Sequence, residues 1–279
     1  MGSMLGMLPR WYSLLGDKKL IVGTLEDVVP DIPPNKRGQP PKHPIKQYLI
    51  LIVLKESKHA PLRGAETDWS EYVCGERVDH SVIHYWERNL PAEIIEDAIR
   101  LVGKKLEELL GYEFSVIDAT AFSSWHNRHC SFHLLNRING ETVYPVSMAR
   151  DTYDPVPNTK DVIVPGSGFF MGDKWYDVNG VFRVVYKSGY TPLISQQRTR
   201  CSGHWRRRGR KDYDKRKYRH RGRGESTFGS LTNWLGDRLH TRKRLTTYIR
   251  SCARILCYQV KILIRTGIYG NFVIILLNT

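Results

Sequence analysis

EFSVIDATAFSSWHNRHCSFHLLNRINGETVYPVSM, residues 113–148, is the stretch of the sequence that decides the fold. Its beginning, 113–118, and two later runs, 131–138 and 142–148, have the short apolar pattern of β-strands. The Asn139-Gly140 pair between the last two runs is a strong hairpin signal. Pro145 has no amide hydrogen to donate, so its strand should lie at a sheet edge. The stretch therefore predicts three strands joined by hairpins.

Downstream of this stretch, strands and helices alternate. Short strands are predicted over 168–172 and 191–195, with a helix over 177–188 between them. Strands that follow such crossovers should run parallel to the first strand. Two later helices are predicted over 221–235 and from Leu245 to a stop at Gly267. We therefore expect a mixed α/β domain over 112–267 and a tail over 268–279.

Upstream, the sequence changes to a helical pattern. Apolar residues recur at helical spacing, and helices are predicted over 45–59, 63–74, 78–88 and 91–110. The first segment, 1–44, contains many prolines and should form an irregular arm. We expect a helical region over 45–111.

Charge is the unusual property of the composition. Lys plus Arg is 43 and Asp plus Glu is 28 among 279 residues, a net charge of +15. Such an excess favours nucleic acid as the partner. No apolar run reaches the length of a membrane span, so we expect no membrane partner. The five scattered cysteines do not form a disulfide framework, and we expect a cytoplasmic protein associated with the nucleoid.

Three acidic residues are candidates for a metal site. Asp118 and Asp173 each end a predicted strand, and Glu225 is on the helix that follows. The carboxyl ends of parallel neighbours meet at one sheet edge, where ligands bind in open α/β sheets. Converging carboxylates repel, and Mg²⁺ relieves this repulsion with oxygen ligands. A strand-end Asp is also a common helix cap, and a helical Glu is commonly a solvated surface group.

Three motifs carry a resemblance to a known family: VIDAT at 116–120, GDKWYD at 172–177 and YRHRGRGE at 218–225. They resemble the acidic motifs of the DDE transposases of prokaryotic insertion sequences. In one branch, the third motif is Tyr, two residues, Arg, three residues, Glu, six residues and Lys. Tyr218, Arg221 and Glu225 match this spacing, but Thr232 stands in place of the Lys. The departure puts one expected contact with the DNA backbone in doubt.

The resemblance implies a ribonuclease-H-like mixed-sheet catalytic core in which the third strand is an edge. It implies that Asp118, Asp173 and Glu225 hold Mg²⁺ or Mn²⁺, as two ions, with no small-molecule cofactor. It also implies cleavage of double-stranded DNA at the element ends, transfer of the 3′-OH into target DNA, and a homodimer on DNA. Four residues of the second and third motifs would contact the DNA: Lys174, Tyr176, Tyr218 and Arg221.

A basic segment, 198–223, precedes Glu225, and about half of its residues are Lys or Arg. It would bind the DNA backbone through Arg206, Arg207 and Arg208, with Trp205 or Tyr213 stacking on an unpaired base. The alternative is a solvated, disordered loop.

Two further features have open interpretations. The helices within 63–88 form either a helix-turn-helix, whose second helix presents Ser81, His84, Tyr85 and Arg88 to DNA, or part of the core. His126, His129, Cys130 and His133 have side chains that suit zinc, but their spacing matches no standard site. For the whole chain, the alternatives are an inactive DNA-binding transposase relic and a nuclease without strand transfer.

Overall fold

The computed structural model describes residues 18–33, 40–124, 129–140, 142–198, 200 and 203–277. Five strands form one mixed sheet in the order β3-β2-β1-β4-β5. Their bounds are β1 Phe114–Ser123, β2 His129–Asn139, β3 Thr142–Arg150, β4 Phe169–Gly172 and β5 Thr191–Ile194. β1, β2 and β3 are antiparallel neighbours, whereas β4 and β5 run parallel to β1. The predicted hairpins and crossovers are confirmed.

Pro145 lies in β3, which is an edge strand as predicted. The pairing of β3 with β2 shifts register between Leu135 and Asn136, next to the proline. The carbonyl of Pro145 accepts a hydrogen bond from the Gln259 side-chain amide at 2.9 Å. The edge thus accommodates the missing donor, and a helix packs beside it.

Helices pack around the sheet and also make up the N-terminal part of the molecule. In the N-terminal part they are α2 Lys18–Val28, α3 Ile45–Ser57, α4 Leu62–Asp68, α5 Ser70–Cys74, α6 His80–Asn89 and α7 Ala92–Leu110. Among and after the strands they are α8 Pro155–Val162, α9 Asn179–Lys187, α10 His204–Asp212, α11 Lys215–Tyr218, α12 Glu225–Leu235 and α13 Arg244–Leu277, with 3-10 turns η2 Lys174–Tyr176 and η3 Arg219–Gly224.

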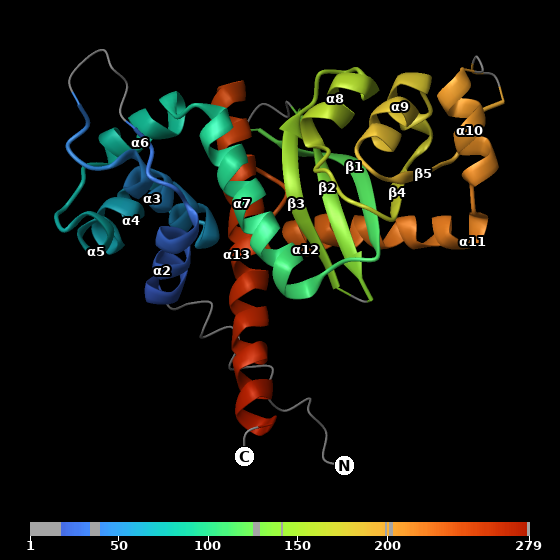
Figure 1. The fold of residues 1–279 in the computed structure, drawn as a ribbon. Coiled ribbons are helices and arrows are strands. Elements are labelled where there is room, and N and C mark those ends of the chain that lie inside the picture. Colours follow the sequence, from blue (N-terminus) through green and yellow to red (C-terminus); the bar gives the residue numbers. More distant parts are fainter. Residues whose placement is uncertain are drawn as a thin grey trace.

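The two parts meet along α13. Figure 1 shows the N-terminal helices on one side of α13 and the sheet on the other, with α7 beside α13. α13 packs against α3, α6, α7 and β3, and one continuous cluster of buried apolar side chains runs through both parts. The helical part and the sheet part therefore share a core. No helix in the described part of the chain is long and apolar enough to span a membrane.

Three predictions about elements are wrong. The arm over 1–44 was expected to be irregular, but residues 18–28 form α2, whose Ile21, Val22 and Leu25 lie at helical spacing and are buried. α2 packs on α3 and α13, and six of the seven prolines within 1–44 follow it. The last helix continues past Gly267 to Leu277, since a single glycine weakens a helix without ending it. The helix predicted over 221–235 begins as the 3-10 turn η3 and becomes α12 at Glu225.

Candidate active site

The edge of the sheet brings Asp118 and Asp173 to one cleft. β1 and β4 pair in parallel with Val116 opposite Met171, so the two aspartates follow at equal distances along neighbouring strands. They line a cleft of about 320 Å³. Its other lining residues are Ala119, His133, Asp151, Tyr153, Trp175 and Tyr176.

The pleat of β1 and a glycine bring Glu225 close to Asp118. Side chains two apart on a strand share a face, so Asp118 is on the face of Val116. Gly224 packs on Val116 so closely that an added Cβ would meet Val116 Cγ1 at 2.7 Å. Because only a glycine permits this approach, η3 and the start of α12 lie against β1, with Glu225 immediately following the contact.

Arg221 joins Asp118 to Glu225. Its guanidinium lies 3.6 Å from Asp118 Oδ2 and 3.2 Å from Glu225 Oε1. Its Nε is buried and has no hydrogen-bond partner among the described residues. The space between the two carboxylates therefore holds a positive charge supplied by the protein itself.

The electrostatics of the site disfavour ionised Asp118. Burial raises the pKa of the Asp118 carboxyl, and the nearby carboxylates of Asp173 and Glu225 raise it further. The Ala119 amide, which donates to Asp118 Oδ1 at 2.9 Å, and the Arg221 charge act in the opposite direction without cancelling the rise. Such a site gains free energy when it binds a cation.

A turn and an aromatic stack fix Asp173. The Trp175 amide donates to Asp173 Oδ1 at 2.8 Å, so this residue is also the cap of η2. The Trp175 ring stacks on His133 with the ring centroids 5.3 Å apart. The hydroxyl of Tyr176 and His133 Nδ1 are 2.6 Å apart, and His133 Nε2 is 3.1 Å from Asp151 Oδ1. This network holds the turn that carries Asp173.

Sequence reasoning missed most of this network. Trp175 lies within the GDKWYD motif, which was its available signal. Asp151 follows β3 with no motif around it, and only the hairpin register places it near His133. Of the four candidate zinc ligands, His126 and the side chain of His129 lie outside what the structure describes, Cys130 is buried, and His133 makes the contacts above.

A tighter group of metal-type side chains lies elsewhere, in the N-terminal helices. Ligand atoms of Glu66, Asp79 and His80 are all within 4.8 Å of one another, and no other such group occurs in the described ranges. Their contacts are structural: Arg77 donates to Glu66 at 2.6 Å, and Asp79 caps α6. Asp118, Asp173 and Glu225 are spaced more widely than this group, with Arg221 between two of them.

The predicted DNA contacts differ in their exposure. Lys174, Arg207, Arg208 and Arg88 are exposed, whereas Trp205 and Tyr218 are partly buried. The Tyr218 hydroxyl donates to the Gly172 carbonyl at 3.3 Å, next to Asp173. The Trp205 and Tyr186 rings lie 5.8 Å apart. The basic segment is not a disordered loop where it is described, because α10, α11 and η3 fill most of it.

Two predicted DNA contacts are corrected. Arg206 is 1% exposed and forms a two-point ion pair with buried Asp177, at 2.6 and 2.7 Å. This pair fastens α10 to the segment before α9, so the guanidinium is not available to a phosphate. Tyr176 is also 1% exposed, with its hydroxyl directed to His133. Both side chains make contacts inside the fold and do not face the DNA.

Comparison with known proteins places this arrangement in a family. The family model described as "Transposase DDE domain" matches residues 111–260, which include every element of the sheet and all three acidic motifs. The chain belongs to this family. As a DDE transposase it has the expected α/β, ribonuclease-H-like mixed sheet.

One solved structure similar to this DDE transposase is the "Cryo-EM structure of piggyBac transposase synaptic complex with hairpin DNA". The likeness has a TM-score of 0.40 and 9% sequence identity, and it covers 88% of this chain and 71% of that one. No curated protein matches this chain.

Proposed function

We propose that this transposase cuts double-stranded DNA at the ends of a mobile element and joins the 3′ ends to target DNA. The observation that carries the proposal is the shared cleft of Asp118 and Asp173, with Glu225 held beside Asp118. We place catalysis in residues 112–267 and DNA recognition in residues 45–111.

Asp118, Asp173 and Glu225 fit a pair of divalent cations, Mg²⁺ or Mn²⁺. All three offer oxygen ligands, and burial and mutual repulsion raise the pKa of Asp118. Such ions, when bound, activate the attacking oxygen and stabilise the leaving oxygen of a phosphodiester. The Arg221 guanidinium pairs with Asp118 and Glu225, and we assign it to a phosphate of the DNA at this site.

Other residues of the chain position the DNA. Lys174 is exposed next to Asp173, and Tyr218 lies over the same strand end. We assign both to the phosphates near the cut. The exposed Arg207 and Arg208 on α10 extend this contact along the backbone, where charge gives salt-dependent affinity. Trp205 remains a candidate for base stacking.

We assign recognition of the element ends to α6. Ser81, Tyr85 and Arg88 are exposed on this helix, while Ile83 and Glu87 on its other side are buried. An exposed polar and aromatic face on a helix suits base contacts in the major groove. Pairing of two ends requires two active sites, so we propose a homodimer on DNA.

The test uses DNA that flanks the coding sequence, because element ends carry short inverted repeats. We expect nicking in Mg²⁺ or Mn²⁺, and strand transfer when a precut end is supplied. Asp118→Asn, Asp173→Asn and Glu225→Gln should each lower the rate by more than about a thousandfold, or roughly 4 kcal/mol. DNA affinity without metal should stay within about twofold, since none of these acids is assigned to DNA binding.

Asp161→Asn is the matched control, because Asp161 is an exposed acid of α8 that neither the site nor the DNA contacts use. It should cut at the wild-type rate. Metal-dependent nicking by Asp173→Asn at the wild-type rate would refute the assignment.

Thr232 favours a second candidate, a relic that binds DNA without cutting it. Its hydroxyl donates to the carbonyls of Phe228 and Gly229 on its own helix, so this position offers no cation to a phosphate. A relic would bind the flanking DNA without nicking it in either metal. A nuclease without strand transfer would nick the DNA but leave precut ends unjoined.

A further inference from the structure

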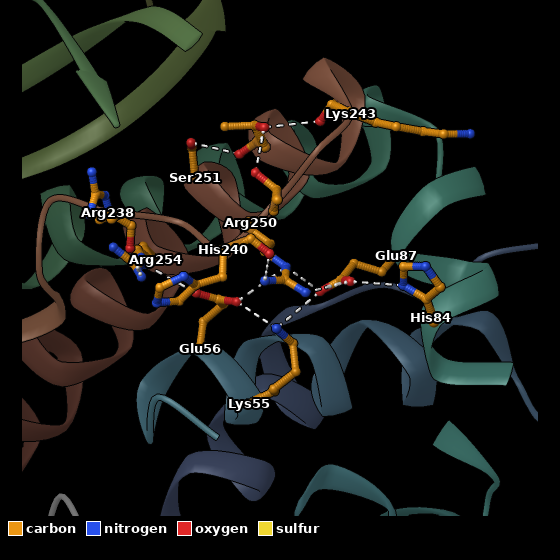
Figure 2. Close-up of polar contacts among 12 residues, drawn as sticks. Lys55, Glu56, His84, Glu87, Arg238, His240, Lys243, Arg250, Ser251 and Arg254 are labelled. Atoms are coloured by element: carbon orange, nitrogen blue, oxygen red, sulfur yellow. Dashed lines mark hydrogen bonds and ion pairs between the residues drawn. The ribbon is translucent and has the colours of Figure 1, made fainter. Parts of the chain in front are cut away.

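Five charged side chains form a buried cluster where α3, α6 and α13 meet. They are Lys55, Glu56, Glu87, Arg250 and Arg254, named here the five-charge cluster. Lys55 lies 2.6 Å from Glu56 and 3.0 Å from Glu87, and Arg250 lies 2.6 Å from Glu87. Figure 2 shows these groups directed toward one another, with the arginines entering from α13. The proposed site uses none of them.

Arg254 is the member that reaches beyond the cluster. It is 4% exposed, and its Nε donates to Glu56 at 3.1 Å. Its two terminal nitrogens donate to the carbonyls of Gly236 at 2.8 Å and Arg238 at 3.1 Å. Its guanidinium also lies 5.2 Å from the centre of the Phe122 ring on β1. One side chain thus joins α3, β1 and the segment that leaves α12.

That segment, 236–239, fastens the end of α12 to the end of β1. Ser123 donates to the Asp237 carbonyl at 3.1 Å, and Leu239 donates to the Ser123 carbonyl at 2.8 Å. Ser123 and Arg238 form a parallel bridge. Since Arg254 binds the carbonyls on both sides of Asp237, it holds the segment in the shape that this bridge requires.

α12 is therefore fixed along β1 at two points. Gly224 packs on Val116 before its first residue, and the 236–239 segment bonds to Ser123 after its last. Asp118 lies on β1 between these points, and Glu225 is the first residue of α12. Release of the far point would let the helix tilt about Gly224, which would change the spacing between Glu225 and Asp118.

We propose that Arg254 is a positioning residue for the acidic site: it sets the distance between Glu225 and Asp118 through the 236–239 segment. This inference rests on the proposed function, in which these two acids share cations. Groups that orient metal ligands without touching the metal commonly change metal affinity by about 10–100-fold when they are removed.

Charge balance provides a pair of matched variants. The cluster has three cations and two carboxylates, so loss of one cation leaves two of each. Arg254→Met and Lys55→Met each remove one buried cation and keep a long apolar chain. Lys55 pairs with Glu56 and Glu87, whereas Arg254 also binds two carbonyls of the 236–239 segment. Both variants should fold, and only one should disturb α12.

The experiment measures Mn²⁺ binding to the full chain by calorimetry, without DNA. Arg254→Met should raise the Kd for Mn²⁺ about tenfold or more, while Lys55→Met should stay within about twofold of wild type. Arg254→Lys, which keeps the charge but has fewer donors, should fall between wild type and Arg254→Met. An unchanged Kd in Arg254→Met, or an equal rise in Lys55→Met, would overturn the inference.

Hydrogen exchange supplies a readout that does not involve metal. The amides of Ser123 and Leu239 should exchange faster in Arg254→Met than in Lys55→Met, because they form the bridge. Equal exchange in the two variants would also overturn the inference. Asp118→Asn separates the two proposals: if it leaves Mn²⁺ binding unchanged, the proposed function fails, whatever Arg254→Met does.

Discussion

At the sheet edge one arginine pairs with only two of three carboxylates, whereas between α3, α6 and α13 two carboxylates meet three cations. The difference appears in the pKa values. Burial raises the pKa of Asp118, and its acidic neighbours add to this. Burial alone would also raise the pKa of Glu56 and Glu87, but Lys55 and Arg250 outweigh it, and both values are lowered.

The comparison separates two uses of buried charge. In the five-charge cluster, every carboxylate has its partners within the fold, so the cluster stabilises one arrangement of the helices. At the sheet edge, Asp118 is left short of positive charge and gains from a ligand that supplies it. An acid that the fold leaves poorly compensated is a better sign of function than a well-paired acid.

The largest expected effect is the loss of a cluster carboxylate. Glu87→Ala should lower the free energy of unfolding by about 3–5 kcal/mol, because Lys55 and Arg250 would remain buried without this partner. Urea unfolding measures it. Glu108→Ala, at an exposed acid of α7, is the control and should change it by no more than about 0.5 kcal/mol. Similar losses in both variants would show that the cluster is not a stabilising unit.

The next largest effect should be the loss, at low pH, of the stability that the five-charge cluster contributes. Because the pKa of Glu87 is lowered from 4.5 to about 2, its contribution is complete above pH 4.5 and is lost as the pH falls toward 2. The contribution is on the order of 3 kcal/mol. The measurement is the difference in unfolding free energy between wild type and Glu87→Gln, taken from pH 7 to pH 2. A difference that stays constant over this range would contradict the prediction.

The contribution of Asp118 at the sheet edge to stability should change with pH in the opposite direction. Because the pKa of Asp118 is raised in the folded state, its ionisation costs stability as the pH rises above its ordinary value. Asp118→Asn removes this cost and should raise Tm at pH 7, by roughly 2–4 °C for each kcal/mol recovered. Scanning calorimetry without metal measures it. A lower Tm would mean that the ion pair with Arg221 outweighs the repulsion.

The smallest effect should come from metal itself. Mg²⁺ or Mn²⁺ at a concentration equal to its Kd should stabilise the wild-type chain by about 0.4 kcal/mol, and more at higher concentration. A chelator should reverse the gain. Asp118→Asn should show none of it, while Glu87→Gln should keep it, because the cluster is not assigned to metal. Equal stabilisation of all three proteins would point to nonspecific binding.

Much of the catalytic sheet could be predicted from the sequence, because it depends on local patterns. The Asn139-Gly140 turn, the Pro145 edge and the crossovers before β4 and β5 fix the strand order. That order in turn places Asp118 beside Asp173. The strand order does not place Glu225, and its prediction as a site residue also depended on the family resemblance. Its position next to Asp118 depends on Gly224 packing against Val116.

The missed features depend on pairs that are distant in the sequence. Arg206 looked like one more residue of a basic segment, but it folds back on Asp177. Nothing in the apolar periodicity of α3 or α13 indicates that Glu56 and Arg254 would meet, 198 residues apart. A charged residue on an amphipathic helix has the same local pattern whether it is solvated or buried. Only the three-dimensional packing of α3 against α13 distinguishes the two cases.

The long α13 also has a consequence for biosynthesis. It is the last of the described elements to be translated, yet it supplies Arg250 and Arg254 and packs on α3, α6 and α7. Until the ribosome has made it, Glu56 and Glu87 have only Lys55 as a cluster cation. A nascent chain that already contains all three acidic motifs therefore still lacks the helix that completes its N-terminal half. A product truncated before α13 should be cleared by proteases rather than persist as a partial transposase.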